Sequence, residues 1–411
     1  MPRGRWLRAL VVDSRPLRHR DFRLLYLGQM VSFAGSMITY VAIPFQLFSL
    51  THSPLAVGLL GLAELVPLLL TALVGGALAD ARDRRRLVRA TEAGLALASA
   101  GLAVNAFLPH PRVGVLYAAA AVMAGLDGLQ RPSLEALVPR LVAREELPAA
   151  AALNSLRGNA GMLAGPALGG LLVAAAGLPV AYLVDVASFV VSLLALRLVR
   201  TVPPPPEAEH PSLRSVAEGL RYAWSRPDLL GTYVVDVVAM VFGMPMALFP
   251  AIADRFGGAG TLGLLYAAPS AGALLVSAAS GWIARVRRHG LAIALAAAAW
   301  GVAITAFGFV GSLWPALALL AAAGGADMVS GMFRTTMWNQ TVPDALRGRL
   351  ASIEMLSYST GPSLGNVEAG AVASAFGVRA SVVSGGVLCV VAVVAVTLAL
   401  PAFRTYDSRP A

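Results

Sequence analysis

The sequence predicts an all-α integral membrane protein with twelve transmembrane helices in two pseudo-symmetric six-helix bundles. Composition is the first observation: 57% of the 411 residues are hydrophobic and 13% are charged, whereas soluble globular chains carry about 25% charged residues. Apolar runs of about 18 residues or more recur along the chain, and each is long enough to cross a bilayer as a helix. The third observation is a repeated glycine–proline segment, which indicates two similar halves.

The repeat joins Gly165–Gly170 (GPALGG) to Gly361–Asn366 (GPSLGN), about half a chain apart. A second pair has nearly the same separation: Gly61–Pro67 (GLAELVP) and Gly263–Pro269 (GLLYAAP). Two similar halves in a membrane-embedded chain are typical of secondary transporters. The repeat therefore predicts a transporter in which two bundles alternate access to a central site.

The chain divides into five expected parts. They are a cytoplasmic tail (1–21), an N-terminal six-helix bundle (22–198), a cytoplasmic linker (199–228), a C-terminal six-helix bundle (229–401) and a second cytoplasmic tail (402–411). The expected membrane spans are 22–48, 55–79, 87–108, 113–138, 148–176, 180–198, 229–253, 261–284, 290–310, 313–338, 349–375 and 379–401.

The connections between spans alternate in arginine content. The net charge is +10, and all 32 basic residues are arginine. One set of connections holds most of them, and the other set holds only Arg112, Arg255 and Arg379. The positive-inside rule places the arginine-rich set and both termini in the cytoplasm. We therefore expect a multi-pass protein of the inner (plasma) membrane.

The linker opens with Pro203–Pro206, which predicts a semi-rigid extended spacer. The following segment, Pro211–Trp224, has apolar residues at helical spacing. We expect this segment to lie along the inner membrane surface.

Several function classes are excluded by composition. The absence of lysine excludes a Walker-type phosphate loop, and the single Cys389 excludes an intrachain disulfide. The positive charge follows the membrane topology, so it does not indicate nucleic-acid binding. An intramembrane transferase, the distant alternative, would need an Asp-rich or histidine-based site, yet all five histidines fall in loops or tails. We expect no enzyme activity, no cofactor and no metal.

The connection between the second and third spans carries a recognisable motif. Gly76-x-x-x-Asp80 followed by arginines resembles the loop signature of the major facilitator superfamily. The resemblance implies that fold, and a gate in which Asp80 interacts with the other half and helps lock the outward-open state. Ala81 stands where a basic residue is usual, and the second half lacks the aspartate, so the lock is expected to be one-sided. The gating residues implied are Gly76, Asp80, Arg84 and Arg85.

The fifth span contains glycines around a proline, which bends a helix and lets another backbone approach closely. It resembles the fifth-helix signature of proton-coupled antiporters, which implies a hinge and seal between halves. An ordinary tight helix contact is the alternative. The residues concerned are Gly161, Gly165, Pro166, Gly169 and Gly170.

Further segments resemble the enterobactin (siderophore) exporter-like branch, which includes macrolide-efflux members. They are Thr51–Gly58, Val138–Val142 and Val342–Arg349, together with the prolines of the linker. The resemblance extends over residues 16–400, and it implies export of a drug, siderophore or secondary metabolite.

Ionisable residues within the spans are functional candidates, because a charge at mid-bilayer costs about 2.5–3.5 kcal/mol on insertion scales. Asp127 lies mid-way in the fourth span with Arg131 four residues later, and Asp327 in the tenth span has Arg334 seven residues later. Each pair shares a helix face, so an ion pair is feasible. The alternative is that these charges only stabilise the bundle.

Glu64 has no arginine within one turn, so it is expected either to carry a proton near neutral pH or to face a watery cavity. Asp236 and Glu368 are second-rank candidates. Asp185 is expected at the outer interface, and Glu92 is expected near an inner helix end, beside loop arginines.

The sequence thus predicts a secondary active efflux transporter, in which a bulky, largely apolar small molecule leaves the cell as protons enter. Its partners would be that substrate, protons and the lipid bilayer, and we expect a monomer. An importer or facilitator of a small nutrient is the alternative, and the glycine–proline signature counts against it.

Overall fold

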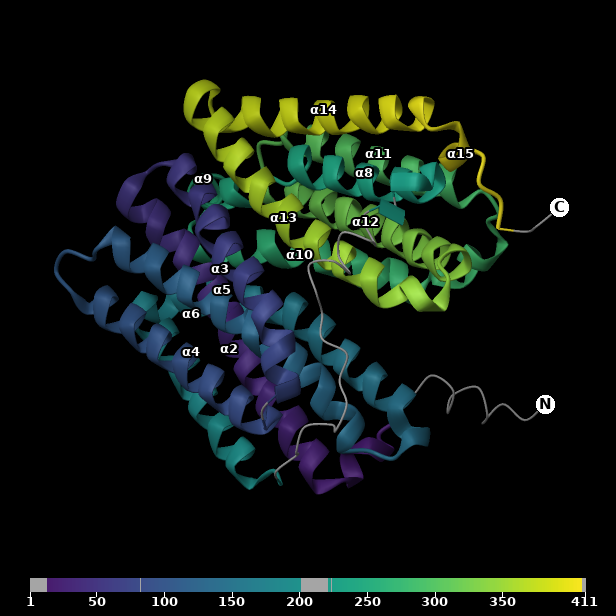
Figure 1. Ribbon diagram of the computed structural model, residues 1–411. Coiled ribbons are helices and arrows are strands. Elements are labelled where there is room, and N and C mark those ends of the chain that lie inside the picture. The colour runs from purple at the N-terminus through teal and green to yellow at the C-terminus, as the bar shows by residue number, and fades with distance from the viewer. Residues whose placement is uncertain (1–12, 82, 201–220, 223, 409–411) are drawn as a thin grey trace, which may run out of the picture. The chain divides into compact units, whose positions relative to one another are not determined.

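The computed structural model describes residues 13–81, 83–200, 221–222 and 224–408, with the backbone alone for 73–81 and 344–358. The predicted linker segments therefore lie almost entirely outside the described residues. The described chain is built from helices (Figure 1). The long ones are α2 (Arg20–Thr51), α3 (Pro54–Ala81), α4 (Arg84–Phe107), α5 (Val113–Leu137), α6 (Leu147–Leu198), α8 (Pro227–Phe242), α10 (Ala259–Ala278), α11 (His289–Phe307), α12 (Leu313–Thr341), α13 (Asp344–Phe376) and α14 (Val378–Ala399).

Ten helical segments in the described ranges are long and apolar enough to cross a membrane. One of them, Arg144–Leu198, has 55 residues, which is too long for a single crossing. Within it, Gly177 has φ 82° and ψ 170°, so the helix breaks there, where the sequence predicts a boundary between spans. The all-α membrane architecture is confirmed. The number twelve is consistent with this break and with α13, whose first half is described by its backbone alone.

The seventh expected span, 229–253, is interrupted. Helix α8 ends at Phe242, a 3₁₀ turn follows at Met246–Leu248 (η4), and α9 continues over Phe249–Phe256. Backbone groups freed inside a membrane need other partners. Trp300 Nε1 donates to the Gly243 carbonyl at 2.8 Å, and Asn366 Oδ1 accepts from the Ala247 amide at 3.1 Å. Side chains of α11 and α13 thus stabilise the interruption.

The chain packs as two compact units. The first unit takes Met1–Ala42 and Val66–Pro211, and the second takes Ile43–Leu65 and Ser212–Ala411. The packing groups residues 43–65 with the second unit, whereas the sequence-based division runs from 22 to 198 without interruption. Within the second unit, Gly58 and Gly61 of α3 lie against the backbone of α13 at Asn366 and Ser363.

In the first unit, α4 packs against α5 and α6. The glycine–proline segment of α6 lies against α2, because Gly161 faces the Phe33 ring and Gly169 faces the Ile38 backbone. A side chain at Gly169 would press on the α2 backbone, and one at Gly161 would displace the Phe33 ring. A core cluster joins α2, α4, α5 and α6, and its members are almost completely buried. They include Phe22, Leu25, Tyr26, Val88, Leu137 and Leu196.

In the second unit, α12 packs against α10 and α11, and α8 packs against α13 and α14 (Figure 1). The repeated segment has the same role as in the first unit: Gly361 and Gly365 of α13 lie against Met240 and Val241 of α8. The internal repeat therefore encodes one helix contact, made once in each unit.

Candidate functional site

A buried ion pair joins α8 and α12 in the second unit. The Arg334 guanidinium contacts the Asp236 carboxylate, and the two side chains are 2% and 6% exposed. The Arg334 guanidinium also lies 4.0 Å from the Asp327 carboxylate, whose side chain is 41% exposed. The structure thus brings together three predicted residues, and its main partner for Arg334 is Asp236 from another helix rather than Asp327 from the same one.

Neighbouring contacts set the register of the two helices. The rings of Tyr233 on α8 and Trp338 on α12 stack with centroids 4.9 Å apart. Trp338 Nε1 also donates to Thr232 Oγ1 at 2.8 Å. Because these contacts lie within about one turn of Asp236 and Arg334, they hold the ion pair in place.

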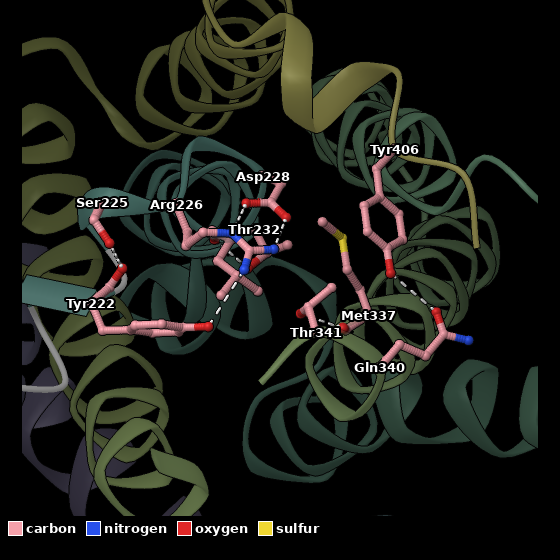
Figure 2. Close-up of polar contacts among 10 residues, drawn as sticks. Tyr222, Ser225, Arg226, Asp228, Thr232, Met337, Gln340, Thr341 and Tyr406 are labelled. Atoms are coloured by element: carbon pink, nitrogen blue, oxygen red, sulfur yellow. Dashed lines mark hydrogen bonds and ion pairs between the residues drawn. The ribbon is translucent and has the colours of Figure 1, made fainter. Parts of the chain in front are cut away.

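The start of α8 is held by a second polar group, shown in Figure 2. Arg226 donates to both carboxylate oxygens of Asp228, at 3.0 and 2.7 Å, and to the Tyr222 hydroxyl at 3.4 Å. The hydrogen bonds to Asp228 hold the pKa of Arg226 above its ordinary value. On the facing side, the Tyr406 hydroxyl donates to Gln340 Oε1 at 3.3 Å (Figure 2). The hydrogen bonds of Arg226 join Tyr222, near the end of the linker, to the start of α8.

The ion pair expected between Asp127 and Arg131 is not formed. Arg131 instead lies 3.5 Å from Glu135, one turn further along α5, and both side chains are mostly exposed. Asp127 is exposed as well. It interacts electrostatically with Arg131, Asp185 and Glu92, all in the first unit.

Two carboxyl groups expected near helix ends, Glu92 and Asp185, are both 0% exposed. The position of Asp185 at the outer membrane interface stays a prediction. Glu92 contacts glutamine and serine side chains rather than loop arginines. The available signal was the spacing of polar residues in otherwise apolar helices: Gln29, Ser32 and Thr39 in α2, and Asp185, Ser188 and Ser192 in α6.

The remaining candidates are less buried than expected. Glu64 on α3 is only partly buried, and it does not lack an interaction partner. Its two expected roles, as a proton carrier or as a residue facing a watery cavity, stay predictions. Glu368 on α13 is partly buried.

The arginines of the predicted gating loop bind helix ends of their own unit. Arg84 donates to the Ala136 carbonyl at 3.2 Å, at the end of α5. Arg85 donates to the Leu196 and Arg197 carbonyls at 2.9 and 2.7 Å, at the end of α6. Cations there satisfy free carbonyls and the negative end of the helix dipole. Gly76 and Asp80 lie in the last turns of α3, and their surroundings fall outside the described residues.

A cavity of about 570 Å³ opens between α2, α5 and α6 in the first unit. Its wall includes Tyr26, Gln29, Asn154 and Arg157. The Arg157 Nε is buried and has no hydrogen-bond partner among the described groups. The cavity therefore presents two amides and the Arg157 cation beside the Tyr26 ring, and Arg131 and Glu135 also line it.

The sequence matches the model of a known protein family over almost its whole length. The family model described as transmembrane secretion effector matches residues 13–411. The chain belongs to this family. It is 29% identical over 393 residues to the enterobactin exporter EntS of Shigella boydii, covering 95% of this chain and 94% of that protein. The enterobactin exporter EntS of Escherichia coli O1:K1 is 28% identical with the same coverage.

Solved structures agree on the fold. A bacterial homologue of the lysosomal transporter spinster matches with a TM-score of 0.76 at 16% identity, covering 97% of this chain and all of that one. The nucleoside transporter NupG (D323A mutant) matches with a TM-score of 0.74 at 11% identity, covering 92% and 99%. The chain has the major facilitator fold that its loop motif implies. It is a secondary transporter of a small molecule in a membrane, and not an enzyme.

Proposed function

We propose that the chain exports a bulky small molecule in exchange for protons. The observation that supports this most directly is the Asp236–Arg334–Asp327 group. Charges inside a membrane are costly, and they are retained mainly on substrate and ion pathways. The Asp236 carboxylate is buried and the Asp327 carboxylate is partly exposed, and both lie beside one guanidinium. The net charge of this group therefore changes when a single proton binds.

The same group suggests a substrate class. Protonation of Asp327 would remove the second negative charge beside the Arg334 guanidinium, which favours an acidic or phenolic oxygen of the substrate at that position. The relatives are named enterobactin exporters, which supports a siderophore or a similar amphipathic metabolite. Efflux by alternating access, in a monomer of the inner membrane with both termini in the cytoplasm, is part of this proposal.

The other candidate residues have supporting roles in the proposal. Asp127 is the accessible carboxylate of the first unit, and Glu64 and Glu368 are further protonatable groups of the second. Asp80 would gate the loop after α3. The segment from Gly161 to Gly170 would act as hinge and seal through its close contact with α2.

The test uses purified protein in liposomes with an imposed pH gradient, and iron-free enterobactin as the probe. We expect enterobactin movement coupled to proton flux in the opposite direction. Asp327→Asn should reduce gradient-driven transport, whereas Asp254→Asn, an exposed carboxylate near the end of α9, should not. Movement indifferent to the gradient would replace the antiporter with a facilitator, and net uptake under the gradient would replace it with an importer.

A further inference from the structure

Polar side chains gather inside the first unit, between helices whose other faces are apolar. They come from α2, α4, α5 and α6 and surround two carboxyl groups, Glu92 and Asp185. In the order of the chain the group is Gln29, Ser32, Thr39, Glu92, Ser99, Gln130, Asp185, Ser188 and Ser192, and every member is buried.

Glu92 is bound by neutral groups alone. Its Oε1 accepts from Gln29 Nε2 at 2.5 Å, from Gln130 Nε2 at 3.2 Å and from Ser32 Oγ at 3.3 Å. Its Oε2 is buried and makes no hydrogen bond with any described group. The three donors stabilise a negative charge on Oε1, whereas Oε2 has no hydrogen-bond donor among the described groups.

Asp185 has a similar environment. Its Oδ2 accepts short hydrogen bonds, both 2.6 Å, from Thr39 Oγ1 and Ser99 Oγ. Ser188 Oγ lies 3.4 Å from its Oδ1. Gly35 on α2 is packed so closely against Asp185 and Ser188 that a side chain there would overlap both. Three helices therefore close around this carboxyl group.

No described cation forms an ion pair with Glu92 or Asp185, in contrast to Asp236, which Arg334 neutralises. An isolated buried carboxylate is costly, so such a group takes up a proton unless a partner compensates its charge. Among the described residues, ionisable groups that interact electrostatically with the cluster include Asp127 on α5, which interacts with both carboxyls, and Tyr182 beside Asp185 on α6.

Glu92 also has a route to water. Gln29, its closest donor, lines the 570 Å³ cavity of the first unit. A single amide therefore separates the carboxyl group from a space that admits water. Along α6, Ser192 and Ser188 continue the polar face from the Gln29–Glu92 contact toward Asp185.

We propose that Glu92 and Asp185 also bind exchanged protons, so that the first unit carries proton-binding groups in addition to the Asp236–Arg334–Asp327 group of the second. This inference rests on the proposed antiport. On loading, each carboxylate gains a proton and becomes neutral. On release, the O–H bond of Glu92 breaks, the proton passes to water in the cavity beside Gln29, and the three donors to Oε1 stabilise the carboxylate that remains.

A first experiment needs no substrate. Infrared difference spectroscopy of the full-length protein in lipid vesicles, titrated through neutral pH, reports the carbonyl stretch of protonated carboxyl groups. We expect Glu92→Gln and Asp185→Asn each to remove part of that band, and Glu145→Gln, an exposed residue of the loop before α6, to leave it intact. Ser99→Ala, a milder change, should shift the frequency of the Asp185 component alone.

A second experiment measures coupling with enterobactin in liposomes. Glu92→Gln and Asp185→Asn should lower gradient-driven transport by about tenfold or more, within the usual range of coupling energies, while downhill equilibration continues. An unchanged infrared band in both variants, or full gradient-driven transport by both, would overturn the inference. If the wild-type protein moves enterobactin without proton flux, the antiport proposal fails, and the infrared band still decides whether the two groups bind protons.

Discussion

Arg334 of α12 and Asp236 of α8 form an ion pair in which both side chains are almost completely buried. The two residues lie on helices that are far apart in the sequence, and their contact ties the seventh and tenth expected spans together. Breaking such a pair leaves an uncompensated charge in a medium that solvates it poorly. The pair is therefore the place where a single substitution has the largest expected effect on the second unit.

Asp236→Asn should lower the free energy of unfolding by about 3–5 kcal/mol, because Arg334 loses its buried counter-charge. Thermal unfolding of the detergent-solubilised protein would measure the loss. The double variant Asp236→Asn with Arg334→Gln should recover part of it, since no buried guanidinium remains without its counter-charge and Asp327 is 41% exposed. Equal stability of the wild-type protein and the single variant would show that Asp327 alone neutralises Arg334.

The glycines of α6 offer a matched pair of substitutions. Gly169→Ala places a methyl group 2.9 Å from the Ile38 Cα of α2, and overpacking of this kind costs about 1–3 kcal/mol. Gly158→Ala, on the same helix, meets nothing within 4 Å. We expect the first change to lower the melting temperature and the second to leave it unchanged or slightly higher. A similar response of both variants would argue against a tight α2–α6 contact.

Arg85 and Arg86 are neighbours with different environments. Arg85 binds two carbonyls at the end of α6, whereas the Arg86 side chain is 81% exposed and lies 3.6 Å from Asp83. Arg85→Ala should cost about 1–3 kcal/mol, the scale of hydrogen bonds to a charged group. Arg86→Ala should cost little, because surface ion pairs contribute about 0–1 kcal/mol. If only the transport rate changed in Arg85→Ala, a gating role would outweigh the capping role.

Asp127→Asn should leave the folded protein as stable as wild type, because its side chain is exposed and forms no hydrogen bond in the described structure. Gradient-driven export should nevertheless fall sharply, because Asp127 is proposed to relay protons to Glu92 and Asp185. Transport in liposomes, with the melting temperature as the control for folding, would measure both. Full retained transport would remove Asp127 from the mechanism.

The sequence predicts the helices well because membrane spans depend on local apolar runs and on arginine placement. It also predicts the break near Gly177, where the structure has a positive φ that glycine tolerates. The interruption after Phe242 was not expected. It depends on Trp300 and Asn366, which are brought to the backbone of this span only by folding.

The site was predicted less completely, because ion pairing depends on which helices meet. Arg131 has a carboxylate one turn before it and another one turn after it, so spacing alone could not choose between Asp127 and Glu135. Arg334 presented the same difficulty, since its main partner lies on α8. The position of Glu92 near the start of α4 predicts contacts with loop arginines, yet its contacts come from α2 and α5.

Because α8 ends at Phe242 and α9 begins at Phe249, the seventh expected span consists of two short α-helices joined by a segment that is not α-helical. A continuous helix resists bending along its whole length, whereas here the helical ladder is replaced by a few side-chain hydrogen bonds that can exchange partners. Any tilt of α9 relative to α8 is thus concentrated at Gly243–Leu248. We therefore expect that substitutions in Gly243–Leu248 change the rate of the transport cycle without touching the substrate.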